Sequence, residues 1–300
     1  MTSERRAASL VGEQAQAVGK KARLRRSAWR TLRHNPIAMA ALFGFGLLLL
    51  TVILAPVITS IPPNDHDYEH LLEPPSWTHP FGTDDLGRDI LSRVLWGGRE
   101  SLRVAVMAIA VAVSGGIVVG LVSGYFGGWL DTLIMRIVDV LLAFPSILLL
   151  LSIVAALGPN LGTVLIALGI SAIPSFSRLV RGSVLAARNY EYVTAARVLG
   201  ASDAYIMFTQ ILPNIMAPLI IYATVGLGGA ILTTAGLSYL GLGAQPPSPE
   251  WGAMLNAGRT HLRDAWWMSV FPGLAIFLAV LFVNLLSDGL RDALDPKLRL

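Results

Sequence analysis

The sequence contains no cysteine and few charged residues. Of its 300 residues only 14% are Asp, Glu, Lys or Arg, against roughly 25% in an average soluble domain. The absence of cysteine excludes disulfides, thiolate metal sites and cysteine nucleophiles. The low charge, together with 54% hydrophobic residues and a mean hydropathy of +0.62, indicates that lipid is the main solvent of this chain.

Two further absences limit the reactions that this chain can carry out by itself. No Gly-x-x-x-x-Gly-Lys-Ser/Thr sequence occurs, so the chain carries no phosphate loop of that type. The histidines lie outside the long apolar runs, at His34, His66, His70, His79 and His261. This placement argues against a proton relay through histidine inside a membrane and against a membrane-embedded hydrolase with a histidine base.

Long apolar runs predict the fold. At least five of them approach or exceed the roughly 20 residues that a helix needs to cross a hydrocarbon core of about 30 Å. We predict an all-α integral membrane protein with about six transmembrane helices, at residues 37–59, 102–123, 133–157, 161–176, 215–242 and 266–286. The first run follows about 35 polar residues and is longer than a signal-peptide core, so we expect it to be a retained helix.

Proline, glycine and charge refine this prediction. Pro36 suits the first turn of the first span and Pro56 is expected to bend its far end. In the second span Gly116, Gly120 and Gly124 recur every four residues, which lets another helix approach closely. Arg136 and Asp139, three residues apart on one helical face, are predicted to pair with each other at the cytoplasmic end of the third span.

The distribution of basic residues predicts the orientation of the chain. Arg and Lys are concentrated in residues 1–36 and recur in residues 178–214, whereas residues 60–100 are mostly acidic. The positive-inside bias therefore places the tail 1–36 in the cytoplasm and the loop 60–100 outside. Six crossings return the tail 289–300 to the cytoplasm. We interpret the basic tail as a membrane flank and expect no nucleic-acid partner.

The external loop 60–100 is predicted to contain an amphipathic helix over residues 85–96, capped by Thr83 or Asp84 and lying along the membrane surface. Its acidic residues lack the alternating ligand pattern of an EF-hand, so no metal site is expected. Residues 101–288 are then a five-helix core.

Within that core, the polar segment 188–213 carries the most information. It predicts two short helices separated by a break at Gly200, which suits the left-handed conformation that ends a helix. Ser202 or Asp203 is placed to cap the second helix. Ala195 and Ala196 leave a shallow surface. From the residues alone, a docking site for a partner and a simple surface turn both remain open.

This segment resembles the EAA loop of ABC importer permeases, in which Glu-Ala-Ala precedes a Gly and a Leu-Pro pair at fixed spacing. Thr194 stands in place of the glutamate and Gln210 in place of an isoleucine, with Ile211 adjacent. Glu191, one helical turn earlier, is a candidate substitute for the missing carboxylate. The resemblance implies that the loop docks on an ATPase through Glu191, Thr194, Ala195, Ala196, Gly200, Ser202, Asp203, Leu212 and Pro213.

Residues 79–93, 240–255 and 271–296 narrow the resemblance to the C-type permease subunit of the dipeptide and oligopeptide branch. The resemblance implies a type I ABC importer transmembrane domain in the bacterial inner membrane, forming half of a pore. Implied partners are a homologous B-type permease, two ATPase subunits that bind ATP and Mg, and an extracytoplasmic peptide-binding protein. No cofactor or catalytic residue is expected on this chain, and the resemblance assigns no residue to the substrate path.

Two alternatives stand beside peptide import. Relatives of similar sequence carry glutathione or nickel, so either is a rival substrate for the same machinery. A secondary transporter would require acids near the membrane midplane or paired broken helices. We find neither in the sequence.

Overall fold

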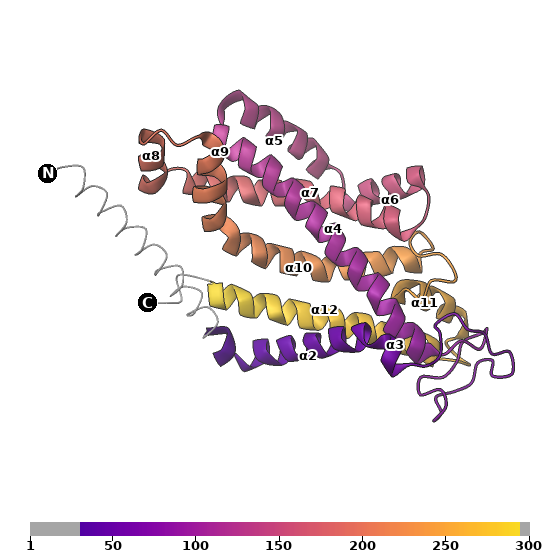
Figure 1. Ribbon diagram of the computed structural model, residues 1–300. Coiled ribbons are helices and arrows are strands. Elements are labelled where there is room, and N and C mark those ends of the chain that lie inside the picture. Colours follow the sequence, from indigo (N-terminus) through magenta and orange to yellow (C-terminus); the bar gives the residue numbers. More distant parts are fainter. Residues whose placement is uncertain (1–30, 295–300) are drawn as a thin grey trace.

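The structure is a computed structural model that describes residues 31–294. Within this range the regular structure is helical, apart from a single bridge between Thr83 and Asp89. Five helices are long and apolar enough to cross a membrane, and a bent helix pair makes a sixth candidate. The long helices lie side by side, with the loop that follows α3 at one end and α8 at the other (Figure 1). The predicted all-α membrane fold with about six spans is confirmed.

The first span begins at α2 (Pro36–Ile53) and continues as the short α3 (Ala55–Ile58). Asn35 caps α2, because its side-chain oxygen accepts from the backbone N–H groups of residues 37 and 38 at 3.1 Å each. Pro36 occupies the first turn, where no N–H is needed. The break between the two helices lies just before Pro56, as predicted.

The second long helix, α4 (Ile90–Phe126), is continuous over 37 residues. The separate surface helix predicted for residues 85–96 is therefore wrong. Asp89 caps α4 by accepting from the Ser92 N–H at 2.7 Å, so Thr83 and Asp84 are not the cap. The apolar residues taken for a membrane-facing stripe, Ile90 and Val94, are instead buried inside the protein.

Helix α4 packs closely against α7 (Leu161–Ala187). The predicted glycine stripe forms this contact: a Cβ placed on Gly120 would lie 2.5 Å from the Ser177 carbonyl oxygen, and one on Gly124 would lie 2.9 Å from the Val184 Cβ. Since α7 runs well past the predicted end at residue 176, the first part of the predicted loop 178–214 is helical.

The predicted third span, 133–157, is two helices. Helix α5 (Gly128–Ala143) and helix α6 (Ser146–Leu157) meet at an angle of 87°. The break falls at Phe144, whose φ of −81° and ψ of 136° are extended. Pro145 is the cause, because the residue before a proline is disfavoured in the helical conformation.

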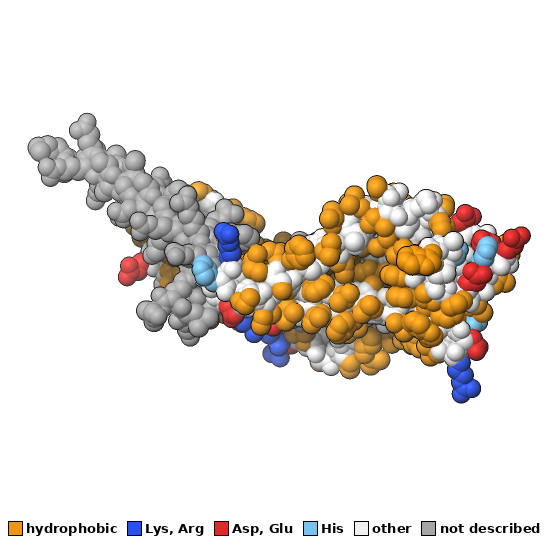
Figure 2. Space-filling view, turned by 90° about the horizontal axis from the view of Figure 1, so that it is seen from below, with side chains coloured by type: hydrophobic (Ala, Val, Ile, Leu, Met, Phe, Trp, Pro, Cys, Tyr) orange, Lys and Arg blue, Asp and Glu red, His pale blue; other side chains and the backbone are white. Residues whose placement is uncertain are grey.

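The remaining spans are α10 (Leu212–Tyr239) and α12 (Trp267–Leu294). Between them lie α11 (Trp251–Gly258) and a 3₁₀ turn (Arg259–His261), which the sequence did not predict. Helix α12 packs against both α2 and α10. Figure 2 shows hydrophobic side chains over the middle of this face and charged ones toward its two ends, the pattern expected of a multi-pass membrane protein.

Candidate functional site

The loop predicted as the functional segment lies at the end of the bundle where α2 begins and α12 ends (Figure 1). It consists of α8 (Glu191–Val198), α9 (Asp203–Tyr205) and a π-helical turn (Ile206–Ile211). The two short helices are present as predicted. The second one, however, continues through the π-helical turn into α10 without interruption.

The break between α8 and α9 has the geometry that the sequence indicates. Gly200 has a φ of +80°. Its N–H donates to the Arg197 carbonyl at 3.0 Å, and the Ala201 N–H donates to the Ala196 carbonyl at 3.1 Å. These two bonds satisfy carbonyls that the end of α8 would otherwise leave unpaired. Ser202 then caps α9, accepting from the backbone N–H of residue 205 at 3.3 Å.

Asp203 makes a different contact from the predicted cap. The Tyr125 hydroxyl at the end of α4 donates to the Asp203 carboxylate at 2.6 Å. The Arg197 guanidinium lies 5.7 Å from the centre of the same Tyr125 ring. On the other side of the loop, the Asn214 side-chain amide donates to the Tyr192 hydroxyl at 3.2 Å, and burial raises the pKa of that Tyr192 hydroxyl. The loop is thus tied to both α4 and α10.

One side of the loop is a small hydrophobic core. Val193 is fully buried and packs with Ile206 and Ile211 against residues of α4, α7 and α10. Gln210 stands where the EAA pattern has an isoleucine, and the adjacent Ile211 supplies a buried aliphatic side chain there instead. This core fixes α8 and the π-helical turn to the ends of three spans, so a displacement of the loop must displace those ends too.

The opposite side of the loop is open. Ala196 and Leu212 are half-buried, and the other predicted coupling residues are exposed, namely Glu191, Thr194, Ala195, Gly200, Ser202, Asp203 and Pro213. At the tip of α8, Val198 is 81% exposed and Leu199 is 76% exposed. The tip of α8 thus exposes two adjacent apolar side chains among polar ones.

A second polar contact, which the sequence did not predict, lies beneath this loop. Arg181 on α7 donates through two nitrogens to the two carboxylate oxygens of Asp131 on α5, at 2.6 Å each. The same carboxylate accepts from Ser123 on α4. Arg188 donates to the Gly124 carbonyl at 2.9 Å. The only sequence signal was the presence of charged residues at the ends of neighbouring spans.

The prediction that Arg136 pairs with Asp139 is wrong. The Arg178 guanidinium on α7 donates to the Asp139 carboxylate on α5 at 2.6 Å. The helix-to-helix pair forms because α5 lies against α7, which three-residue spacing within α5 could not reveal.

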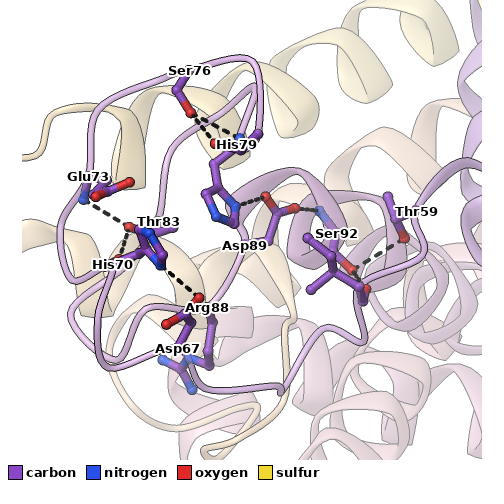
Figure 3. Close-up of polar contacts among 12 residues, drawn as sticks. Thr59, Asp67, His70, Glu73, Ser76, His79, Thr83, Arg88, Asp89 and Ser92 are labelled. Carbon is purple, nitrogen blue, oxygen red and sulfur yellow. Dashed lines mark hydrogen bonds and ion pairs between the residues drawn. The ribbon is translucent and has the colours of Figure 1, made fainter.

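At the other end of the bundle, the stretch 79–93 holds together the loop that follows α3 (Figure 3). The Asp89 side chain lies 3.0 Å from His79 Nδ1. Thr83 donates to the His70 carbonyl at 2.6 Å and accepts from the Glu73 N–H at 2.8 Å. A buried ion pair joins Arg88 to the preceding turn through the Asp84 carboxylate at 2.7 Å.

A solved structure places this fold in a class. The chain aligns with a chain of the MetNI methionine ABC transporter, described in inward-facing conformations, with a TM-score of 0.54, covering 67% of this chain and 96% of that chain at 20% identity. The fold is that of a type I ABC importer transmembrane domain. Residues 116–300 match the model of the binding-protein-dependent transport system inner membrane component, and residues 23–75 match the N-terminal transmembrane domain of oligopeptide transport permease C. The chain belongs to this permease family of the inner membrane.

Curated relatives support the same family assignment. The dipeptide transport system permease protein DppC of Alkalihalophilus pseudofirmus is 47% identical over 91% of this chain and 90% of that protein. The di/tripeptide permease DppC of Pseudomonas aeruginosa is 44% identical over 90% of this chain and 91% of that protein. The glutathione permease GsiD of Escherichia coli is 48% identical over 90% of each.

Proposed function

We propose that this chain is one of two permease subunits of an ATP-driven importer of dipeptides or oligopeptides, and that it forms half of the pore. The dipeptide and di/tripeptide transport functions of two relatives support a peptide-like substrate. The observation that carries the proposal is the loop between α7 and α10, because it packs on the ends of three spans through one side and exposes Val198 and Leu199 on the other.

In this proposal the loop is the contact with a separate ATPase. A groove of the ATPase receives the exposed side of α8, and ATP and Mg are bound there rather than on this chain. Glu191 and Thr194 are exposed on α8, so the missing glutamate of the EAA pattern removes one possible ion pair but leaves the docking surface. Both chain ends then lie in the cytoplasm, and an external binding protein delivers substrate to the opposite face.

Reconstitution tests the proposal. The purified chain in liposomes should transport nothing, whereas the chain with a homologous B-type permease, two ATPase subunits and the binding protein should take up labelled dipeptide only when ATP is supplied. Uptake by the isolated chain driven by an ion gradient would instead establish a secondary transporter.

The same vesicles separate the possible substrates. Glutathione is favoured as the second candidate by the identity to GsiD, and nickel is the third. Competition of labelled dipeptide uptake by unlabelled glutathione or nickel decides among them, because the true substrate competes at the lowest concentration.

A further inference from the structure

An ion pair lies exposed on the face of two candidate spans. Asp139 on α5 and Arg178 on α7 are 2.6 Å apart, yet their side chains remain 53% and 57% exposed. Arg178 is 17 residues beyond the start of α7 at Leu161, which places it about 26 Å along the helix axis. Charged side chains facing hydrocarbon at such a position are costly. The exposed side of this pair therefore faces water, the lipid headgroups or another protein subunit.

Polar residues continue along the same faces of both helices. On α7, Ser171 and Ser175 precede Arg178 at intervals of four and three residues, so the three side chains share one face. On α5, Thr132 precedes Asp139 by seven residues and lies on the same side of that helix. The two polar faces meet at the ion pair.

The polar face of α7 leads into a hollow of about 520 Å³ between α4, α6, α7 and α10. Its hydroxyl-bearing lining residues are Ser146, Ser171, Ser175, Tyr222 and Thr233, and the rest of its lining is apolar. No lining residue of this hollow carries a charge. Arg178 lies one helical turn beyond Ser175 along α7, so the ion pair brings the charges on this face of α7 that lie closest to the hollow.

We propose that Asp139 and Arg178 line the cytoplasmic half of the solute path and bind the two terminal charges of a zwitterionic peptide during its passage. The substrate ammonium group pairs with Asp139 while its carboxylate pairs with Arg178. Each protein charge exchanges one partner for another, so no charge is left unpaired as the ion pair opens. This inference rests on the proposed peptide import and adds the residues that contact the cargo.

Thiol accessibility tests where the pair faces, and the cysteine-free chain makes single replacements unambiguous. In the full transporter, Ser175→Cys and Asp139→Cys should react with a small charged thiol reagent added from the cytoplasmic side. Val140→Cys is the control, because its side chain is exposed next to Asp139 but on the apolar side of α5. Dipeptide should slow the reaction of Ser175→Cys several-fold. Equal reaction at residues 139 and 140 would overturn the inference.

Neutral replacement tests the role of the charges. The double variant Asp139→Asn, Arg178→Gln should keep its ATPase partners but lose about tenfold or more in dipeptide uptake, the size expected when charge-assisted contacts to a substrate are removed. In this variant dipeptide should no longer protect Ser175→Cys.

The comparison is Asp131→Asn, Arg181→Gln, which removes the contact beneath the loop and should weaken assembly instead. Unchanged uptake and protection in the first variant, or loss of assembly there, each contradict substrate binding by Asp139 and Arg178. ATP-dependent uptake by the parent transporter is a separate measurement, so it tests the proposed function independently of substrate binding by Asp139 and Arg178.

Discussion

Tyr125 and Asp203 are 78 residues apart in the chain, and the Tyr125 hydroxyl donates to the Asp203 carboxylate at 2.6 Å. Tyr125 belongs to the last turn of α4, whereas Asp203 begins α9. The contact is therefore a direct connection between the loop proposed to dock on the ATPase and the 37-residue helix α4.

Tyr125→Phe removes this hydrogen bond while retaining the ring under Arg197. Because Asp203 is exposed and stays hydrated, the loss should be about 1 kcal/mol, below the usual range for a bond to a charged group. We expect normal abundance in the membrane and a several-fold lower ratio of peptide transported to ATP hydrolysed. Tyr239→Phe, at the far end of α10, is the matched control. A parental ratio in Tyr125→Phe would show that the contact does not couple the two activities.

Gly200→Val should disrupt the loop without a clash inside this chain. A Cβ at Gly200 meets nothing within 4 Å, so the cost comes from its φ of +80°, which is of order 1–3 kcal/mol for a β-branched residue. We expect near-normal membrane abundance and a sharp fall in ATPase co-purification and peptide uptake. Gly200→Asn tolerates the conformation better and should be milder. Parental transport by the valine variant would reduce this loop to a surface turn.

Ser202→Ala and Asp203→Ala should weaken different interactions of the loop. Ser202 is the cap of α9, and its loss costs about 1 kcal/mol of local stability. Asp203→Ala instead removes the acceptor of Tyr125 and should reproduce the phenotype of Tyr125→Phe. A double-mutant cycle with Tyr125→Phe should therefore show coupling for Asp203→Ala and additivity for Ser202→Ala. Equal coupling in both cycles would contradict this assignment.

Orientation can be read with single cysteines at two exposed positions. Ser76 lies in the loop that follows α3, and Ala204 lies in α9 at the other end of the bundle. In intact cells an impermeant thiol reagent should label Ser76→Cys and spare Ala204→Cys, and opening the cells should expose the second. The reverse pattern would invert the proposed topology.

The loop that follows α3 should be most stable in mildly acidic solution. The Asp67 carboxylate raises the pKa of His70 above its ordinary 6.5, so the stabilising contribution of His70 is complete below pH 6.5 and is lost as pH rises through its raised value. The bond from His70 lowers the pKa of Asp67 below 3.8, so that contribution is complete above pH 3.8 and is lost on further acidification.

Hydrogen exchange of residues 67–88, corrected for intrinsic rates, should therefore be slowest between pH 3.8 and 6.5. His70→Ala should abolish the rise in corrected exchange on the alkaline side. Persistence of that rise in the variant would assign it to another group of the loop.

Apolar length, glycine spacing and turn chemistry predicted the number of spans, the close approach of another helix to the glycines of α4, and the conformation at Gly200. The length of α4 could not be predicted, because the charged side chains of Arg93 and Arg99 interrupt the apolar run and residues 60–100 were therefore assigned to a loop. In the structure they lie within the helix and donate to carbonyls elsewhere, Arg93 to Pro63 at 2.8 Å and Arg99 to Val52 at 2.9 Å. Such partners are some 30 to 47 residues away, and local patterns carry no information about them.

The break between α5 and α6 was visible in the sequence as Pro145, but a proline fixes neither the angle nor the direction of a bend. The sequence could not predict the ion pairs of the candidate site for a related reason. Asp131 and Asp139 each pair with an arginine of α7, and the choice among nearby arginines depends on how α5 lies against α7, which spacing along one helix does not define.

The unbroken length of α4 gives the molecule a lever arm. A helix of 37 residues is about 55 Å long, and tilting it by about 5° as a rigid rod moves one end by about 5 Å relative to the other. Its C-terminal end is bound to the loop between α7 and α10 through Tyr125. Its N-terminal end contacts Trp251, whose indole N–H donates to the Val94 carbonyl at 2.8 Å. If the loop docks on an ATPase as proposed, a rotation of about 5° imposed near Tyr125 would shift the opposite end of α4 by about 5 Å.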